Sequence, residues 1–132
     1  MSEIPIGTSG ESDLLVTDDV AMDFLGPTTA RVLGTPYLIV NLEFAARNAV
    51  KPLLDDGFDT VGTHVDVRHL AATPIGMHVR FRAEVIGVED RKVRFKVEAF
   101  DDKEKVAEGM HERFIINVAR FAAKLQAKAD GH

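Results

Sequence analysis

From residue 60 onward, hydrophobic and polar residues alternate along the chain with a period of two. The pattern runs through residues 60–70, 78–88 and 92–100, and it continues through 106–121. Because successive side chains of a strand point to opposite faces, each segment predicts a strand with one buried face. Short turn-forming stretches separate the segments, so we expect four consecutive antiparallel strands. The residues expected to point inward in the first three strands are Val61, Thr63, Val65, Val67, His69, Val79, Phe81, Ala83, Val85, Val93, Phe95, Val97 and Ala99.

A different pattern precedes these strands. The stretch GTPYLIVNLEFAARNAV, residues 34–50, is apolar around most of a helical circumference. We expect the helix to begin with Thr35 as its N-terminal cap and Pro36 as its first residue, and to end before Pro52. A single helix of this kind must be covered on several sides. The sequence therefore predicts an α+β fold in which a curved antiparallel sheet wraps around one long central helix.

The N-terminal part of the chain is less regular. Residues 1–12 are rich in Ser, Gly and Glu, so we expect a flexible lead-in there. Residues 13–26 predict a first strand with a polar interruption. The chain has 132 residues, which suits one domain, and we place that domain at residues 13–128.

Composition narrows the classes of partner. The formal net charge of −5 disfavours a nucleic acid as the main partner. No apolar run approaches the roughly 20 residues that span a bilayer, and the N-terminus lacks a signal-peptide pattern, so we expect no membrane partner. The chain has no cysteine, which fits a reducing compartment and a cytoplasmic protein. His64 and Asp66 lack a third ligand at suitable spacing, so we expect no metal site.

Glu43 is out of place in the helical segment. At 3.6 residues per turn it shares a stripe with Ile39, Ala46 and Val50, which are all apolar. A carboxylate in such surroundings needs hydrogen-bond donors, or burial destabilises its ionised form. The alternative is a simple surface pair with Arg47 one turn later. The pattern alone leaves both interpretations open.

His69 strengthens the catalytic interpretation of Glu43. It ends a row of inward-pointing residues on the strand expected to pack on the helix, although a histidine there can also be an ordinary core residue. An imidazole and a carboxylate on packed elements can share acid–base work. Thr35 adds a hydroxyl at the helix start, where it can act as a cap or reach a reacting group.

The stretches GTPYLIVNLEFAA, VGTHVDVRHLAATPIGMHVRFRAEV and GMHERFIIN together resemble the hot-dog-fold acyl-CoA thioesterases, in the branch related to fluoroacetyl-CoA thioesterase. The likeness covers roughly residues 14–128. It implies the hot-dog fold and a homodimer, with tetramers also open, whose sites lie at the interface between copies. It also implies hydrolysis of an acyl-CoA thioester to a free acid and CoA, with no metal or redox cofactor.

The resemblance assigns roles to individual residues. Thr35, Glu43 and His69 match the family's catalytic threonine, glutamate and histidine. Gly62 matches a glycine near the acyl site, and Arg113 matches a family position that either binds CoA phosphates or pairs with Glu112. The segment 26–34 has no aromatic residue where the fluoroacyl-specialised member carries bulky lid side chains, so we expect a short-to-medium acyl substrate rather than fluoroacetyl-CoA.

Two alternatives to a thioesterase remain at this stage. One is a hot-dog hydratase or dehydratase acting on enoyl or hydroxyacyl thioesters, for which the sequence shows no matching signature. The other is a non-catalytic acyl-CoA binding protein. The presence of Thr35, Glu43 and His69 together disfavours a pure binder, because binding alone needs no carboxylate inside an apolar stripe.

Overall fold

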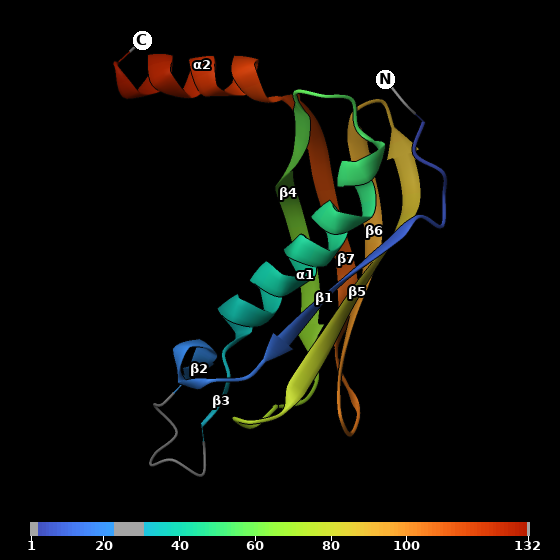
Figure 1. The fold of residues 1–132 in the computed structure, drawn as a ribbon, viewed down its shortest axis with the longest axis vertical. Coiled ribbons are helices and arrows are strands. Elements are labelled where there is room, and N and C mark those ends of the chain that lie inside the picture. The colour runs from blue at the N-terminus through green and yellow to red at the C-terminus, as the bar shows by residue number, and fades with distance from the viewer. Residues whose placement is uncertain (1–2, 23–30, 132) are drawn as a thin grey trace.

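The computed structural model of the chain describes residues 3–22 and 31–131. A five-stranded antiparallel sheet with strand order β1-β5-β6-β7-β4 curls around the helix α1 (Thr35–Val50), as Figure 1 shows. This arrangement confirms the expected wrapping of a curved sheet around one central helix. The strands are β1 (Ser9–Leu15), β4 (Phe58–His69), β5 (His78–Glu89), β6 (Lys92–Asp101) and β7 (Lys105–Asn117).

The helix α1 and the inner face of the sheet form the core. The fully buried side chains of β5 and β6 are the eight that the alternation places inward, from Val79 to Ala99. β1 crosses close to α1 at Gly10, where a Cβ atom would collide with the backbone of Ala45 and Ala49. Glycine and alanine at this crossing therefore let strand and helix backbones approach closely. The buried residues of α1 are Leu38, Leu42, Ala45, Ala46, Ala49 and Val50.

The start of α1 differs from the expected cap. Gly34 is the N-terminal cap and Thr35 is the first helical residue, with no side-chain capping bond. The Gly34 carbonyl accepts from the Leu38 N–H (3.1 Å), while the Thr35 hydroxyl is engaged by His69 instead. The prediction of Thr35 as cap was therefore wrong. At the other end, α1 stops at Val50, before Pro52 as expected, and the 3₁₀ turn Lys51–Leu53 follows. Lys51 itself keeps helical dihedral angles (φ −51°, ψ −43°), so Pro52 does not force the residue before it out of the helical region.

The alternation fails in one place within β4. The register between β4 and β7 shifts between Gly62 and His64, which is the mark of a β-bulge. Before the bulge, Thr60 and Gly62 face α1, so the inward assignment of Val61 and Thr63 was wrong. After the bulge, Val65, Val67 and His69 pair with His111, Gly109 and Ala107 of β7 and share their inward face, as predicted. A bulge adds one residue to a strand, which reverses the faces of the residues before it.

The N-terminal segment is more ordered than expected. β1 begins at Ser9 and pairs with β5, and the side chain of Ile4 is buried at 7% exposure. The proposed boundary at residue 13 therefore falls inside a strand. The first strand predicted for 13–26 ends at Leu15, and after it come a 3₁₀ turn and the short strand β2 (Ala21–Met22), which pairs with β3 (Val32–Leu33). Residues 23–26 of that prediction lie outside the described residues.

The last predicted strand ends earlier than 121. β7 stops at Asn117, whose side chain accepts from the Arg120 N–H and caps the helix α2 (Val118–Ala129). The segment FAAKLQAKA is rich in residues with high helix propensity, which explains the change from strand to helix. α2 projects away from the sheet and buries no residue (Figure 1). Neither helix of the described residues is long and apolar enough to cross a bilayer.

Candidate active site

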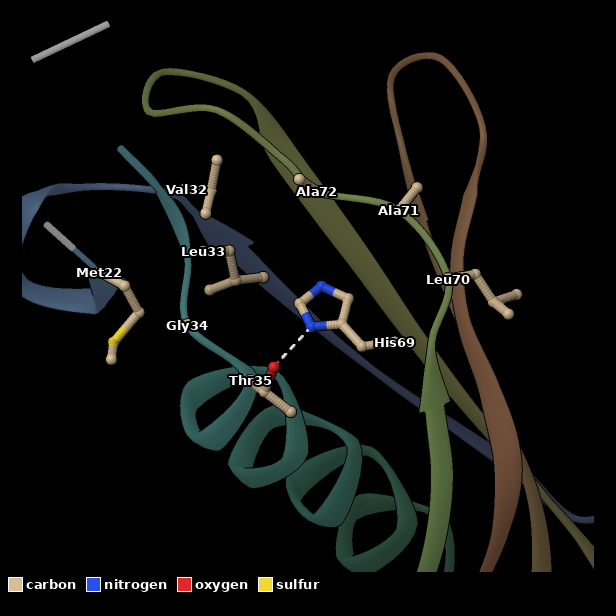
Figure 2. A pocket seen from close by; sticks show the side chains of 9 residues that line it. All are labelled: Met22, Val32, Leu33, Gly34, Thr35, His69, Leu70, Ala71 and Ala72. Carbon is tan, nitrogen blue, oxygen red and sulfur yellow. Dashed lines mark hydrogen bonds between the residues drawn. The ribbon is translucent and has the colours of Figure 1, made fainter. Parts of the chain in front are cut away.

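Thr35 and His69 meet at the N-terminal end of α1. Their side chains come from the first turn of α1 and from the last residue of β4, and a hydrogen bond of 2.8 Å joins Thr35 Oγ1 and His69 Nδ1 (Figure 2). Two backbone bonds fix the approach to the helix, since the Leu33 N–H donates to Thr73 O (2.9 Å) and the Gly34 N–H donates to Val20 O (2.8 Å). Two of the three residues expected to share a site, Thr35 and His69, therefore lie in contact within one chain.

A mainly apolar cavity of about 360 Å³ lies beside this pair and is called here the Thr35–His69 cavity (Figure 2). His69 Nε2 is buried and has no hydrogen-bond partner among the described residues. Burial lowers the pKa of His69, against a smaller opposing effect of the Ala71 backbone. A neutral imidazole with a free nitrogen can accept or deliver a proton beside a bound group. The cavity is lined by Met22, Val32, Leu33, Gly34, Thr35, His69, Leu70, Ala71 and Ala72.

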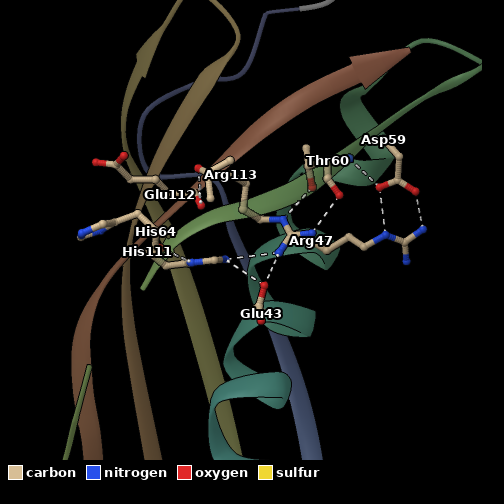
Figure 3. Close-up of polar contacts among 9 residues, drawn as sticks. Glu43, Arg47, Asp59, Thr60, His64, His111, Glu112 and Arg113 are labelled. Atoms are coloured by element: carbon tan, nitrogen blue, oxygen red, sulfur yellow. Dashed lines mark hydrogen bonds and ion pairs between the residues drawn. The ribbon is translucent and has the colours of Figure 1, made fainter. Parts of the chain in front are cut away.

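Glu43 lies in a second cluster, two helical turns farther along α1. Arg113 Nη1 donates to Glu43 Oε1 at 3.2 Å, and His111 Nε2 lies 3.9 Å from the same oxygen (Figure 3). The Glu43 side chain is 34% exposed, whereas that of Arg113 is only 7% exposed. The carboxylate therefore finds a hydrogen-bond donor in Arg113, as one of the two interpretations required, while the Glu43 side chain remains partly open to solvent.

Two hydrogen bonds to Thr60 hold the Arg113 guanidinium in place next to Glu43. Its Nε donates to Thr60 Oγ1 (2.7 Å) and its Nη2 donates to the Thr60 carbonyl (2.8 Å). Burial lowers the pKa of Arg113, opposed most strongly by the charge of Glu43. Glu112 points to the opposite face of β7, where it pairs with Lys92 and Arg94, so the suggested Arg113–Glu112 pair is wrong.

Gly62 completes the second cluster. A Cβ atom at this position would overlap Glu43 Oε1 and would also lie 3.3 Å from His111 Cε1 and 3.4 Å from Arg113 Nη1. Only glycine leaves the carboxylate in contact with the guanidinium at this point of β4. Gly62, which the resemblance matches to a glycine near the acyl site, therefore lies beside Glu43.

Arg47 does not pair with Glu43. Its Nε and Nη2 donate to the two carboxylate oxygens of Asp59, at 2.9 and 2.6 Å. The hydrogen bond with Arg47 is the main reason that the pKa of Asp59 is lowered. This bidentate pair occupies Arg47, so the simple surface pair between Glu43 and Arg47 is wrong.

The three predicted catalytic residues thus form two clusters within one chain. Thr35 and Glu43 are eight residues apart on α1, which corresponds to about 12 Å along a helix with a rise of 1.5 Å per residue. Among the described residues, no hydrogen bond or ion pair joins Glu43 to Thr35 or His69. A site that uses all three groups must therefore bring Glu43 from another copy of the chain or involve a change in conformation.

His111 and Thr60 belong to the second cluster but were not singled out from the sequence. His111 is 2% exposed and Thr60 is 4% exposed. The alternation in VAEGMHERFIIN carries the missing signal, because it places His111 and Arg113 on the same face as the apolar Ile115. Within the described ranges, no group of three or more His, Asp or Glu side chains is arranged to hold a metal ion.

Comparison with known proteins shows that the chain is similar to fluoroacetyl-CoA thioesterases. The model of the fluoroacetyl-CoA-specific thioesterase family matches residues 16–119. The fluoroacetyl-CoA thioesterase of Streptantibioticus cattleyicolor is 36% identical to this chain over 97 residues, which is 74% of this chain and 70% of that protein.

Solved structures give the same result. The structure of the fluoroacetyl-CoA thioesterase FlK superposes with a TM-score of 0.85 and 31% identity, covering 96% of this chain and 98% of FlK. A thioesterase superfamily member from Thermus thermophilus superposes with a TM-score of 0.88 and 28% identity, covering 98% and 96% of the two chains. A hot-dog-like protein from Thermanaerovibrio acidaminovorans gives a TM-score of 0.87 at 22% identity, again over 98% and 96%. These superpositions confirm the hot-dog fold.

Proposed function

The chain belongs to the fluoroacetyl-CoA-specific thioesterase family, and we propose that it hydrolyses short-to-medium acyl-CoA thioesters at a site shared between two copies of the chain. In this site, Thr35 and His69 of one copy act together with Glu43 of the other. The observation that carries the proposal is the separation within one chain, where the hydroxyl–imidazole pair borders a cavity and the carboxylate stands about two turns away with one open side.

Several features of the surface favour a homodimer. β4 forms one edge of the sheet, and a 12-residue strand paired within the described residues only on its β7 side invites pairing with another chain on its outer side. The open side of α1 carries Tyr37, Val40 and Phe44, which are 40%, 43% and 51% exposed. Val65 of β4 points to the same inner side and is 39% exposed. A second copy pairing through β4 would cover these apolar groups with its own.

Each residue has a distinct role in the proposed reaction. Glu43 either takes a proton from the attacking water, or attacks the thioester carbonyl itself to form a mixed anhydride that water then hydrolyses. Either route breaks the carbon–sulfur bond and yields a carboxylic acid and the CoA thiol. His69 donates a hydrogen bond from its free Nε2 to the departing thiolate, which becomes the CoA thiol by taking the proton released from the water molecule. Thr35 orients the imidazole, and its own backbone N–H, at the first residue of α1, stabilises the developing oxyanion.

The residues around Glu43 support the acyl group in this proposal. Gly62 leaves space against the carboxylate, and Arg113 acts on the substrate through Glu43 rather than by holding a phosphate, because its guanidinium is buried under the carboxylate. The apolar lining of the Thr35–His69 cavity suits an alkyl chain of modest size. Of the segment 26–34, residues 26–30 lie outside the described residues, and the lining residues Val32, Leu33 and Gly34 are aliphatic or small.

Thiol release from a panel of acyl-CoA esters, measured beside the loss of enoyl-CoA absorbance, tests the proposal. We expect hydrolysis of saturated acyl-CoAs with acyl chains of about two to eight carbons. Loss of enoyl absorbance would indicate a hydratase instead, and binding without turnover would indicate an acyl-CoA binding protein. A cytoplasmic location, which the lack of cysteine favours, is part of the same proposal.

The variant Glu43→Gln is expected to lower kcat by at least about 10²-fold, because both routes need the ionised carboxylate. The exposed turn residue Glu104, replaced by glutamine, serves as the matched control and should retain wild-type kcat. A Glu43→Gln enzyme with near wild-type kcat would exclude both routes.

A further inference from the structure

His111 is a buried imidazole that the proposed reaction does not use. Its exposed fraction is 2%, and it lies on β7 with its ring stacked at 6.0 Å on Phe95 of β6. A buried histidine must satisfy two ring nitrogens, so its partners decide which nitrogen carries the proton. The partners of the two ring nitrogens are the His64 carbonyl and Arg113, and Arg113 also donates to Glu43.

The two partners of His111 impose the same tautomer. Nδ1 lies 2.8 Å from the carbonyl oxygen of His64, which can only accept, so Nδ1 carries the hydrogen. Nε2 lies 3.2 Å from Arg113 Nη1, which can only donate, so Nε2 carries a lone pair. Both contacts therefore require a neutral ring protonated on Nδ1.

The same guanidinium nitrogen serves Glu43. Arg113 Nη1 donates one hydrogen to His111 Nε2 and has the other for Glu43 Oε1, with both partners at 3.2 Å. The remaining guanidinium nitrogens are taken by Thr60. His111 thus fixes the one part of the guanidinium that Thr60 leaves free, and with it the direction of the N–H that holds the carboxylate.

We propose that His111 is a positioning residue of this active site, whose neutral ring holds Arg113 in the orientation that fixes Glu43, and that protonation of the ring releases this arrangement. The activity measurements that test this inference rest on the proposed function, whereas the tautomer of His111 can be tested without it.

Protonation at Nε2 would replace an acceptor with a donor. The new N–H would face the Arg113 guanidinium at 3.2 Å, where two cations repel, and it would compete for Glu43 Oε1 at 3.9 Å. The charged or titratable groups that face the ring are Glu43 from α1, Arg113 from β7 and His64 from β4, while β6 presents the apolar Phe95. Burial, followed among the charges by Arg113, lowers the pKa of His111, so the neutral ring is the state at neutral pH.

Two substitutions separate the contacts of the ring. His111→Gln places a side-chain acceptor near the position of Nε2 and can still receive a hydrogen bond from Arg113. His111→Asn retains a donor near Nδ1 for the His64 carbonyl but leaves Arg113 without its acceptor. We expect kcat/KM of the Asn variant to fall about tenfold at pH 7.5, and the Gln variant to recover most of that loss.

The pH profile distinguishes positioning from simple packing. The Gln variant cannot be protonated at this site, so its kcat/KM should decline less than that of the wild type between pH 7 and pH 5. The transition of His69 is common to both enzymes and cancels in the comparison. Equal kcat/KM for the two variants, together with an unchanged acid limb, would overturn the inference.

Long-range ¹H–¹⁵N correlation spectra of the wild-type protein test the tautomer without any activity measurement. The His111 signals, assigned by their loss in His111→Gln, should show the Nδ1–H form at pH 7.5 and a pKa below the ordinary 6.5. A ring protonated on Nε2, or charged at neutral pH, would contradict the inference even if the protein hydrolyses acyl-CoA. Failure of the wild type to hydrolyse any thioester would contradict the proposed function and leave the spectra to decide the role of His111.

Discussion

Replacing Gly62 by alanine tests the contact between Glu43 and Arg113 most specifically. The added methyl group would overlap Glu43 Oε1, which no real Cβ atom does, so one of the two groups must move. The backbone of β4 is tied to β7 by its register, whereas the Glu43 side chain is flexible and 34% exposed. We therefore expect the carboxylate to leave Arg113 and to turn toward solvent.

The structure sets the size of the effect. A hydrogen bond to a charged group is worth about 1.5–3 kcal/mol, and about 1.4 kcal/mol corresponds to a tenfold change in rate. Loss of the Arg113 contact should therefore lower kcat/KM by about 10- to 150-fold. The loss of stability should be smaller, no more than about 1–2 kcal/mol, because the pair is partly solvated and alanine reduces the entropy of the unfolded chain.

Steady-state thiol release gives kcat/KM, and urea unfolding gives the free energy of unfolding of the same samples. Gly87→Ala is the matched control, since a Cβ atom at that strand position meets nothing within 4 Å. The control should keep wild-type activity. A Gly62→Ala enzyme within twofold of the wild type would refute the reasoning, as would a loss of activity that is fully explained by unfolding.

Two further predictions concern stability. Gly10→Ala should lower the free energy of unfolding by about 1–3 kcal/mol in urea, because its Cβ atom meets the backbone of α1, which cannot turn aside; an unchanged midpoint would contradict the close crossing. Stability should also fall as the pH drops below about 6.5, since burial lowers the pKa of both His69 and His111, and the unfolded chain then binds protons that the folded chain does not. His111→Gln should show a smaller decline in thermal midpoint between pH 7.5 and pH 5.5, and an unchanged decline would mean that the folded ring binds the proton freely. The lowered pKa values of Asp59 and Glu98 act only at lower pH, below about 4.5.

Much of the fold follows from local patterns. The alternation in β5 and β6 identifies every fully buried side chain of those strands, because both are regular and one face of each packs on α1. The bulge after Gly62 could not be predicted in this way, since the hydrophobic pattern of β4 does not show where an extra residue is inserted. The sequence also did not predict that residues 9–12 form part of a regular strand. These residues are held by backbone pairing with β5 rather than by burial of large side chains.

The candidate site was predictable to a similar extent. Thr35 and His69 were expected to share a site, and the fold joins them by a hydrogen bond. The partner of Glu43 was not predicted, because Arg113 reaches it from 70 positions away in the sequence and no local spacing records such a contact. His111 was not singled out, although it shares the alternation of Arg113.

The central claim is that each active site combines Glu43 of one copy with Thr35 and His69 of another. It is tested most directly by mixing two inactive variants, Glu43→Gln and His69→Asn, under conditions that exchange subunits. Half of the dimers should then be mixed, and each mixed dimer has one site with all native groups, so about a quarter of wild-type activity should return. If the mixture forms mixed dimers, shown by mass spectrometry, and still releases no thiol, the site is contained within one chain and the account is contradicted.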